Sequence, residues 1–223
     1  MPKKKRKVGS GLTHYFSITY VPDDCDNELL AGRCIAEFHK FISSLRLIEN
    51  NSFAIGFPNW SEQSVGNEFA IFSDNSELLS AIKYQPYFNL MRNEELFSIT
   101  DIKPVPNNLP QIRFIRNQSI GKIFIGSKKR RIQRSITRNN KEHTPISNED
   151  REFDTFHKVS CSSKSKQQQY ILHIQKDITP RTIDSKGSYN SYGLATNSKH
   201  LGTVPDLSKI PFYCEEKLSN KDQ

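Results

Sequence analysis

Cysteine is scarce in this chain, and its spacing excludes the common disulfide and metal motifs. The cysteines are Cys25, Cys34, Cys161 and Cys214. They form no C-x-x-C pair, and no His/Cys cluster has the spacing of a zinc site. Nothing in the sequence suggests secretion, so free, buried thiols in a reducing cytoplasm are the default expectation. We therefore expect a function that uses no metal and no cofactor.

Long apolar runs are also missing. No stretch approaches the roughly 20 apolar residues that a membrane-spanning helix needs, so we expect no membrane partner. Acidic residues are missing from one long basic segment: residues 102–141 hold eleven Lys or Arg and no Asp or Glu. This segment organises our interpretation of the chain.

The first residues are set aside, because they have the sequence of a nuclear localisation signal of the large T antigen type. Residues 2–8 read PKKKRKV, and Gly9-Ser-Gly11 forms a flexible linker. Residues 1–11 therefore look like an engineered tag that directs the protein to the nucleus in eukaryotic cells. The tag contributes five of the positive charges, so the formal charge falls from +8 to +3 without it. The remaining positive charge is concentrated in residues 102–141, which favours a nucleic-acid partner.

The second half of the basic segment, Ser127–Arg138, has the pattern of a helix. Four cations share one face at helical spacing: Lys128, Arg131, Arg134 and Arg138. Ile132 and Ile136 fall on another face, where they could pack against the body of the protein. The cationic face predicts a phosphate-binding surface, although most such faces are simply solvated.

An extended segment just before this helix carries Arg116-Asn-Gln118. Arginine can bind guanine and glutamine can bind adenine through paired hydrogen bonds to base edges. We therefore expect Arg116 and Gln118 to recognise bases, whereas the helix binds phosphates.

Apolar periodicity upstream predicts an α+β fold. The expected order is β-α-β-β-α-β, the ferredoxin-like split unit. Its elements are strand 15–21, helix 27–48, strand 53–57, strand 66–72, a helix from residue 76 capped by Asn75, and strand 96–102.

The second half of the chain is predicted to be a smaller, less regular domain. After a linker at 104–110 and the basic helix, two strands at 156–163 and 169–174 form an expected hairpin, and residues 188–194 form a glycine-containing turn or a short strand. The expected units are 1–11 (tag), 12–103 (ferredoxin-like), 104–207 (nucleic-acid-binding) and 208–223 (a flexible tail).

These segments resemble, in order, the type I-F CRISPR repeat-processing endoribonucleases of the Cas-six or Csy-four type. The resemblance covers about residues 15–207. It rests on Ala36-Glu-Phe-His39, Ile55-Gly-Phe-Pro58, Arg116-Asn-Gln118 before an arginine-rich helix, Ser163-Lys-Ser165 in a serine loop, Ser191-Tyr-Gly-Leu194 and Gly202-Thr-Val-Pro205.

The resemblance implies metal-independent cleavage of the CRISPR repeat at the 3′ base of its hairpin, leaving a 2′,3′-cyclic phosphate and a 5′-OH. His39 would transfer the proton of the 2′-OH, Ser163 would hold that hydroxyl, and Tyr192 would position the histidine. Tyr170 stands where the family has a phenylalanine under the last base pair. The implied partners are the repeat hairpin and the other subunits of the type I-F guide-RNA complex (Cascade).

The sequence departs from the family pattern in its serine loop and its tail. The loop lacks the family's glycine, so the functional serine could also be Ser160, Ser162 or Ser165. Residues 60–66 resemble the transposon-associated subbranch, in which the guide directs DNA integration and a transposition-targeting adaptor is a further partner. Defence and transposition both remain open.

Each proposed role has a structural alternative. His39 alone would be an ordinary half-buried histidine, Tyr170 and Tyr192 could be packing residues, and a serine-rich loop is usually only flexible. A second class of function is a non-catalytic subunit that binds the RNA hairpin. Incubation of the protein with repeat RNA in EDTA separates the two classes.

Overall fold

The computed structural model describes residues 11–44, 52–139, 153–163, 168–180 and 188–210. The nuclear localisation motif, residues 45–48 of the expected long helix, residues 164–167 of the serine loop and residues 211–223 of the tail lie outside the described residues. In the described part, no helix is long and apolar enough to cross a membrane.

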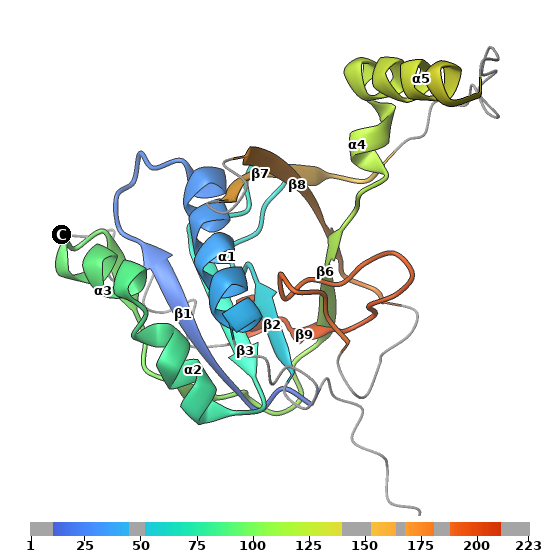
Figure 1. Cartoon of the computed structure of the whole chain (residues 1–223). Helices are drawn as coiled ribbons and strands as arrows, with labels where there is room; N and C mark the ends of the chain where they lie inside the picture. Colours follow the sequence, from blue (N-terminus) through green and yellow to red (C-terminus); the bar gives the residue numbers. More distant parts are fainter. Residues whose placement is uncertain (1–10, 45–51, 140–152, 164–167, 181–187, 211–223) are drawn as a thin grey trace, which may run out of the picture.

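The first sheet has the ferredoxin-like strand order β2-β3-β1-β4, which confirms the predicted fold class (Figure 1). All its neighbouring strands are antiparallel, and Ile18 at its centre pairs with both Phe69 and Ile99. The elements are β1 (His14–Tyr20), α1 (Asn27–Ser44), β2 (Phe53–Gly56), β3 (Glu68–Ser73), α2 (Ser76–Lys83), α3 (Pro86–Asn93), β4 (Phe97–Ile99) and β5 (Lys103–Pro104).

Two local predictions can be compared directly with this sheet. Asn75 caps α2 as expected, because its side chain accepts hydrogen bonds from the backbone N–H groups of Glu77 and Leu78. The strand predicted at 96–102 is shorter, because β4 covers only Phe97–Ile99; β5 follows it beyond the predicted strand, and both β4 and β5 pair with β1. Helix α3 was not predicted, although Pro86 at its first turn is a typical helix-start signal.

The second sheet is antiparallel and has the order β7-β8-β6-β9. It contains the predicted hairpin of β7 and β8, joined in register from Phe156 opposite Gln175 to Ser163 opposite Gln168. Its elements are β6 (Gln111–Arg116), β7 (Phe156–Ser163), β8 (Gln168–Asp177) and β9 (Val204–Pro205), followed by a 3₁₀ helix, η2 (Leu207–Lys209).

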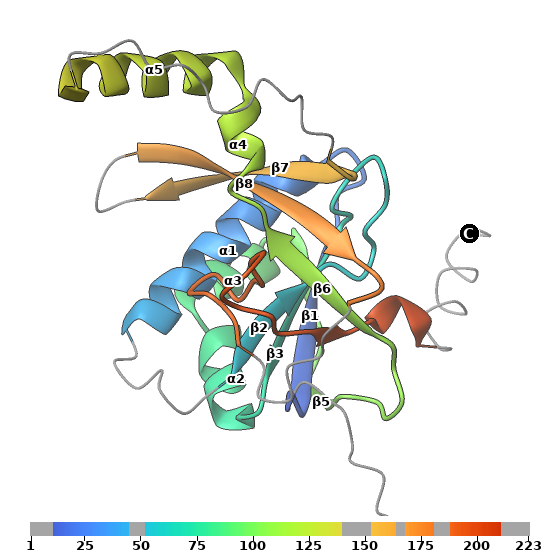
Figure 2. The same cartoon turned by 90° about the vertical axis from the view of Figure 1, so that its right-hand side faces the viewer.

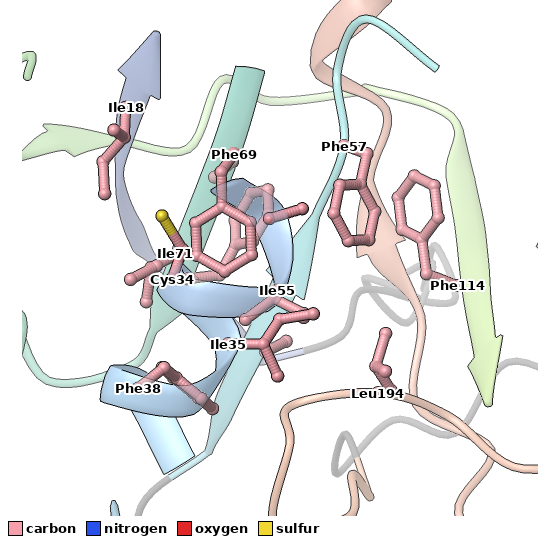
Figure 3. Close-up of a cluster of buried hydrophobic side chains, with 14 of the residues drawn as sticks. Ile18, Cys34, Ile35, Phe38, Ile55, Phe57, Phe69, Ile71, Phe114 and Leu194 are labelled. Atoms are coloured by element: carbon pink, nitrogen blue, oxygen red, sulfur yellow. The ribbon is translucent and has the colours of Figure 1, made fainter. Parts of the chain in front are cut away.

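The apolar core joins the two sheets. Figure 3 shows Ile35 and Phe38 of α1 over the first sheet, with Phe114 of β6 and Leu194 of a C-terminal loop beside them. Phe57 packs edge-on against Phe114, with ring centroids 5.1 Å apart. The two sheets therefore share one buried cluster and hold each other in place.

A glycine brings α1 close to the hairpin. A Cβ at Gly32 would lie 1.8 Å from the backbone carbonyl oxygen of Ser160 in β7, a distance that no real side chain could adopt. The thiol of Cys161 donates to the carbonyl oxygen of Gly32 at 3.6 Å. Helix α1 is therefore packed on the first sheet through one stripe and on β7 through another.

The basic helix projects from this body. Figures 1 and 2 both show α5 (Ile125–Asn139) set apart from the two sheets and joined to β6 through the short helix α4 (Ile120–Ile123). Ile132 and Ile136 are 36% and 37% exposed, so the suggestion that they pack against the body was wrong. A helix that stands off the body exposes nearly its whole circumference, and its apolar side chains then stay in contact with solvent.

Candidate functional site

His39 lies on the stripe of α1 that faces β7. It follows Gly32 by seven residues, which is close to two helical turns, so the two residues share a face. The His39 ring is half-buried, and its Nδ1 lies 2.8 Å from the backbone carbonyl oxygen of Ser191. A carbonyl oxygen only accepts hydrogen bonds, so Nδ1–H is the donor and Nε2 is the basic nitrogen of the neutral ring.

The loop that supplies this carbonyl is folded around Asn190. The Asn190 side-chain oxygen accepts from the backbone N–H groups of Tyr192 at 2.8 Å and Leu194 at 3.3 Å. Gly193 between them has φ +72°, and a Cβ there would lie 3.0 Å from Phe38 and from Ile55. The loop is also tied to β2, because the Ile55 N–H donates to the Gly193 carbonyl at 3.0 Å. The backbone beside His39 is thus fixed to the core.

Tyr192 stacks on His39, with ring centroids 4.5 Å apart and an interplanar angle of 21°. The Arg116 guanidinium carbon lies over the same tyrosine ring, 4.8 Å from its centroid. Arg116 is the last residue of β6, and its backbone N–H donates to the carbonyl of Ala195 at 2.9 Å. The sequence-predicted residues His39, Arg116 and Tyr192 therefore meet, although they come from α1, β6 and the loop.

Tyr170 completes this group from β8. Its ring meets Tyr192 edge-on at 6.3 Å, and it pairs across the hairpin with Cys161. Burial, followed by a hydrogen bond with Tyr192, raises the pKa of the Tyr170 hydroxyl above its ordinary range. Burial also raises the pKa of the Cys161 thiol to about 12, and Arg116 and Tyr170 oppose that rise. Both groups are therefore neutral near pH 7 and act through packing and hydrogen bonding.

The candidate serines are distributed over the end of the hairpin. Ser160 and Ser162 have exposed side chains on β7, and Ser163 ends the strand opposite Gln168. The side chain of Ser163 and the whole of Ser165 lie outside the described part of the chain, so the choice among the serines stays a prediction.

Asn117, between the two predicted base-recognising residues, has a structural role that the sequence did not indicate. It is 6% exposed, and its side chain bonds Gln175 of β8 at 2.7 Å, the Ser119 N–H at 3.0 Å and Asn197 at 3.1 Å. These bonds end the extended segment at Arg116, so Gln118 lies in a turn with an exposed side chain.

The cations of α5 are exposed and lie outside the His39 group: Lys128, Arg131, Arg134 and Arg138. The helix begins where an aromatic contact holds the chain to the hairpin. Phe124 packs on His173 with centroids 5.6 Å apart, and Lys158 lies 5.2 Å over the Phe124 ring. Burial and the charge of Lys158 lower the pKa of His173. This contact determines the direction in which α5 leaves the body.

The described residues contain no group of three His, Cys, Asp or Glu side chains that could hold a metal ion. The site instead offers a basic histidine nitrogen, two tyrosine rings and a guanidinium group. Such a group can transfer a proton, stack on a base and donate paired hydrogen bonds to a base edge or phosphate.

Comparison with known proteins agrees with this chemistry. A family model described as CRISPR-associated protein (Cas_Csy4) matches residues 15–207. No curated protein matches the sequence significantly. Because the family match includes both sheets almost completely and every site residue from His39 to Tyr192, the chain belongs to the Csy4 family of type I-F CRISPR-associated proteins, which bind and process CRISPR repeat RNA.

Proposed function

We propose that this protein is a metal-independent endoribonuclease that cuts the CRISPR repeat at the 3′ base of its hairpin. The observation that carries the proposal is the hydrogen bond between His39 Nδ1 and the Ser191 carbonyl oxygen. It leaves Nε2 as the proton acceptor on a ring that is also held by stacking on Tyr192. A histidine in this state is a suitable general base near neutral pH.

The chemistry needs little beyond this base. The nucleophile is the 2′-OH of the RNA itself, so alignment replaces the activation of a water molecule. His39 Nε2 takes the 2′-OH proton, the 2′ oxygen attacks the adjacent phosphorus, and the bond to the 5′ oxygen breaks. The leaving 5′ oxygen takes a proton from water, giving a 2′,3′-cyclic phosphate and a 5′-OH, and His39 Nε2 releases its proton to the resulting hydroxide. Ser163 holds the attacking hydroxyl.

The other residues of the site bind the stem. Arg116 and Gln118 recognise the last base pairs, which are accessible because the major groove opens at the end of an A-form stem. Tyr170 stacks under the last pair through the part of its ring that remains exposed. Helix α5 binds stem phosphates through the exposed face of Lys128, Arg131, Arg134 and Arg138.

We further propose that the protein stays on its product within the type I-F guide-RNA complex, in the bacterial cytoplasm. A transposition-targeting adaptor is a second proposed partner. The segment that resembles the transposon-associated subbranch, residues 60–66, begins with a partly buried residue that packs against the core. Trp60 packs against Phe57, Phe114 and His157, so its presence is explained by packing and does not identify an adaptor surface.

Cleavage of repeat RNA in EDTA tests the proposal. Purified protein in excess over labelled repeat hairpin should give one cut at the 3′ base of the stem. The upstream product should become a substrate for polynucleotide kinase phosphatase activity, which removes a cyclic phosphate. An RNA with a single 2′-deoxy substitution at the cut site should bind and remain intact. Tight binding without cleavage of the all-ribose RNA would instead favour the non-catalytic RNA-binding subunit.

A further inference from the structure

We propose that Tyr192 is a positioning residue shared by base recognition and catalysis, so that the base pair bound by Arg116 controls the orientation of His39. The inference rests on the proposed function, because it assumes that His39 transfers the proton and Arg116 contacts the last pair. It goes further than the proposed function, because the identity of the terminal base pair then affects the rate of the chemical step as well as the binding affinity.

One ring carries both contacts. Tyr192 stacks on His39 at 4.5 Å and lies under the Arg116 guanidinium at 4.8 Å. Its third neighbour is Tyr170, which packs edge-on at 6.3 Å. If the Tyr192 ring turned to follow one of these three neighbours, its contact with at least one of the others would change.

The backbone joins the same two functions. Around Ala195, the loop is bonded to β6 on both sides: Ala195 N–H donates to Phe114 and Arg116 N–H donates to Ala195, each at 2.9 Å. Three residues earlier, the same loop carries Tyr192, and Ser191 next to it accepts the hydrogen bond from His39. A displacement of the end of β6 is therefore passed to the loop that holds the histidine.

Stacking and base recognition are compatible for a guanidinium group. Stacking uses the face of the planar group, whereas its N–H donors point outward in the plane. Arg116 can therefore remain on Tyr192 while it donates both hydrogen bonds to the O6 and N7 acceptors of a guanine. A base that lacks this acceptor pair leaves the N–H donors of Arg116 without hydrogen-bond partners. The guanidinium then rotates toward other acceptors. The stack on Tyr192 is then lost, and His39 loses the support of a fixed ring.

The test measures cleavage with protein at saturating concentration, where differences in binding no longer affect the rate. Two hairpins are compared, the cognate repeat and one with its terminal pair changed. For the wild-type protein we expect the changed hairpin to be cut about 5- to 30-fold more slowly, the range that corresponds to loss of one partly buried cation–π contact. Arg116→Lys keeps the positive charge and loses the planar guanidinium with its paired donors. This variant should cut the cognate hairpin at a similarly reduced rate, and it should cut the two hairpins at equal rates.

Variants of Tyr192 distinguish a coupling between base recognition and catalysis from a general loss of protein stability. Tyr192→Leu should slow the cognate reaction and bring the two rates within about twofold, whereas Tyr192→Phe, which keeps the aromatic face, should retain the discrimination ratio. Tyr84→Leu is the matched control, because Tyr84 is an exposed tyrosine outside the site. The proposal is overturned if Arg116→Lys reaches the wild-type rate at saturation, or if Tyr192→Leu slows both hairpins by the same factor. Failure of the wild-type protein to cut the cognate hairpin at all would instead overturn the proposed function.

Discussion

A backbone carbonyl decides which nitrogen of His39 can accept a proton. The Ser191 carbonyl accepts from Nδ1, and a side chain in its place could rotate and reverse the roles of the two nitrogens. The carbonyl itself is held by the Asn190 turn, which is tied to β2 through Gly193 and Ile55. The chemistry of one imidazole thus depends on a chain of contacts that ends in the core.

Replacement of His39 tests this role most directly. His39→Ala should lower single-turnover cleavage by about 10²- to 10⁴-fold, the usual contribution of a general acid–base group, while hairpin affinity changes little. Cleavage and binding are measured on the same RNA, by gel assay and by titration. His14→Ala in β1, outside the His39 group, is the matched control and should cut at the wild-type rate. Wild-type cleavage by the His39 variant would remove His39 from the mechanism.

His173 should make stability depend on pH. Its pKa is lowered in the folded protein by burial and then by Lys158, so the unfolded chain binds a proton first as the pH falls. The stability that a neutral His173 contributes is therefore present above the ordinary histidine pKa, near 6.5, and is lost as the pH falls through the folded-state value. His173→Phe should lose less stability between pH 7.5 and pH 5.5 in thermal unfolding. If the wild-type protein and the His173→Phe variant lost equal stability over this pH range, His173 would not be a source of the pH dependence.

At the scale of elements, the approach of α1 to β7 depends on the absence of one side chain. Gly32→Ala would place a Cβ 1.8 Å from the Ser160 carbonyl, and backbone atoms cannot yield as a flexible side chain can. Over-packing of this kind typically costs about 1–3 kcal/mol of folding free energy, so the melting temperature should fall clearly. In α5, Gly126 has no neighbour within 4 Å of the same added atom, so Gly126→Ala should leave stability unchanged or raise it.

Substitutions in strand β6 and in helix α5 should affect RNA binding in different ways. Arg116→Ala, at the end of β6, should cost roughly 1–3 kcal/mol with the cognate hairpin and less with a changed terminal pair, with a near-normal salt dependence. Arg134→Ala, on the exposed face of α5, should weaken both hairpins equally and lower the salt slope by about one counterion. Binding of both hairpins across a salt series measures this. If the two variants behave alike, Arg116 is only one more phosphate contact.

At the scale of the whole molecule, α5 stands away from the group formed by His39, Arg116, Tyr170 and Tyr192. In the proposed function, the exposed cations of this helix bind the stem, which cleavage leaves unchanged, and the scissile phosphate lies at the edge of the stem. Little binding free energy is therefore lost when the RNA is cut. We expect one turnover for each protein molecule, with the hairpin product retained.

An excess of substrate over protein measures this retention. Product should rise to an amount equal to the protein and then stop, and a labelled product hairpin should dissociate slowly. Steady multiple turnover at the rate of the first cut would show that the product leaves, and the proposed role as a lasting subunit of the guide-RNA complex would then fail.

The local sequence pattern was sufficient to predict most of the fold. The spacing of apolar residues indicated β1, α1 and the hairpin, the spacing of cations indicated the basic helix, and the order of elements indicated the ferredoxin-like sheet, which the structure confirms. This works because side-chain burial in a helix or strand follows the period of that element. One signal was available and unused, Pro86 at the start of α3. The glycine-containing turn was expected at 188–194, but the side-chain bonds of Asn190 that hold it were not.

Tertiary structure alone decided the geometry of the site. His39 and Ser191 are 152 residues apart in sequence and 2.8 Å apart in space, and no periodicity within an element reports such a contact. The same holds for Arg116 on Tyr192 and for the bonds of Asn117 to three separate segments. The sequence by itself determined which side chains could do the chemistry. The packing of α1, β6 and the Asn190 turn on one core determined which of them meet, because burial of apolar surface, rather than local pattern, brings distant segments together.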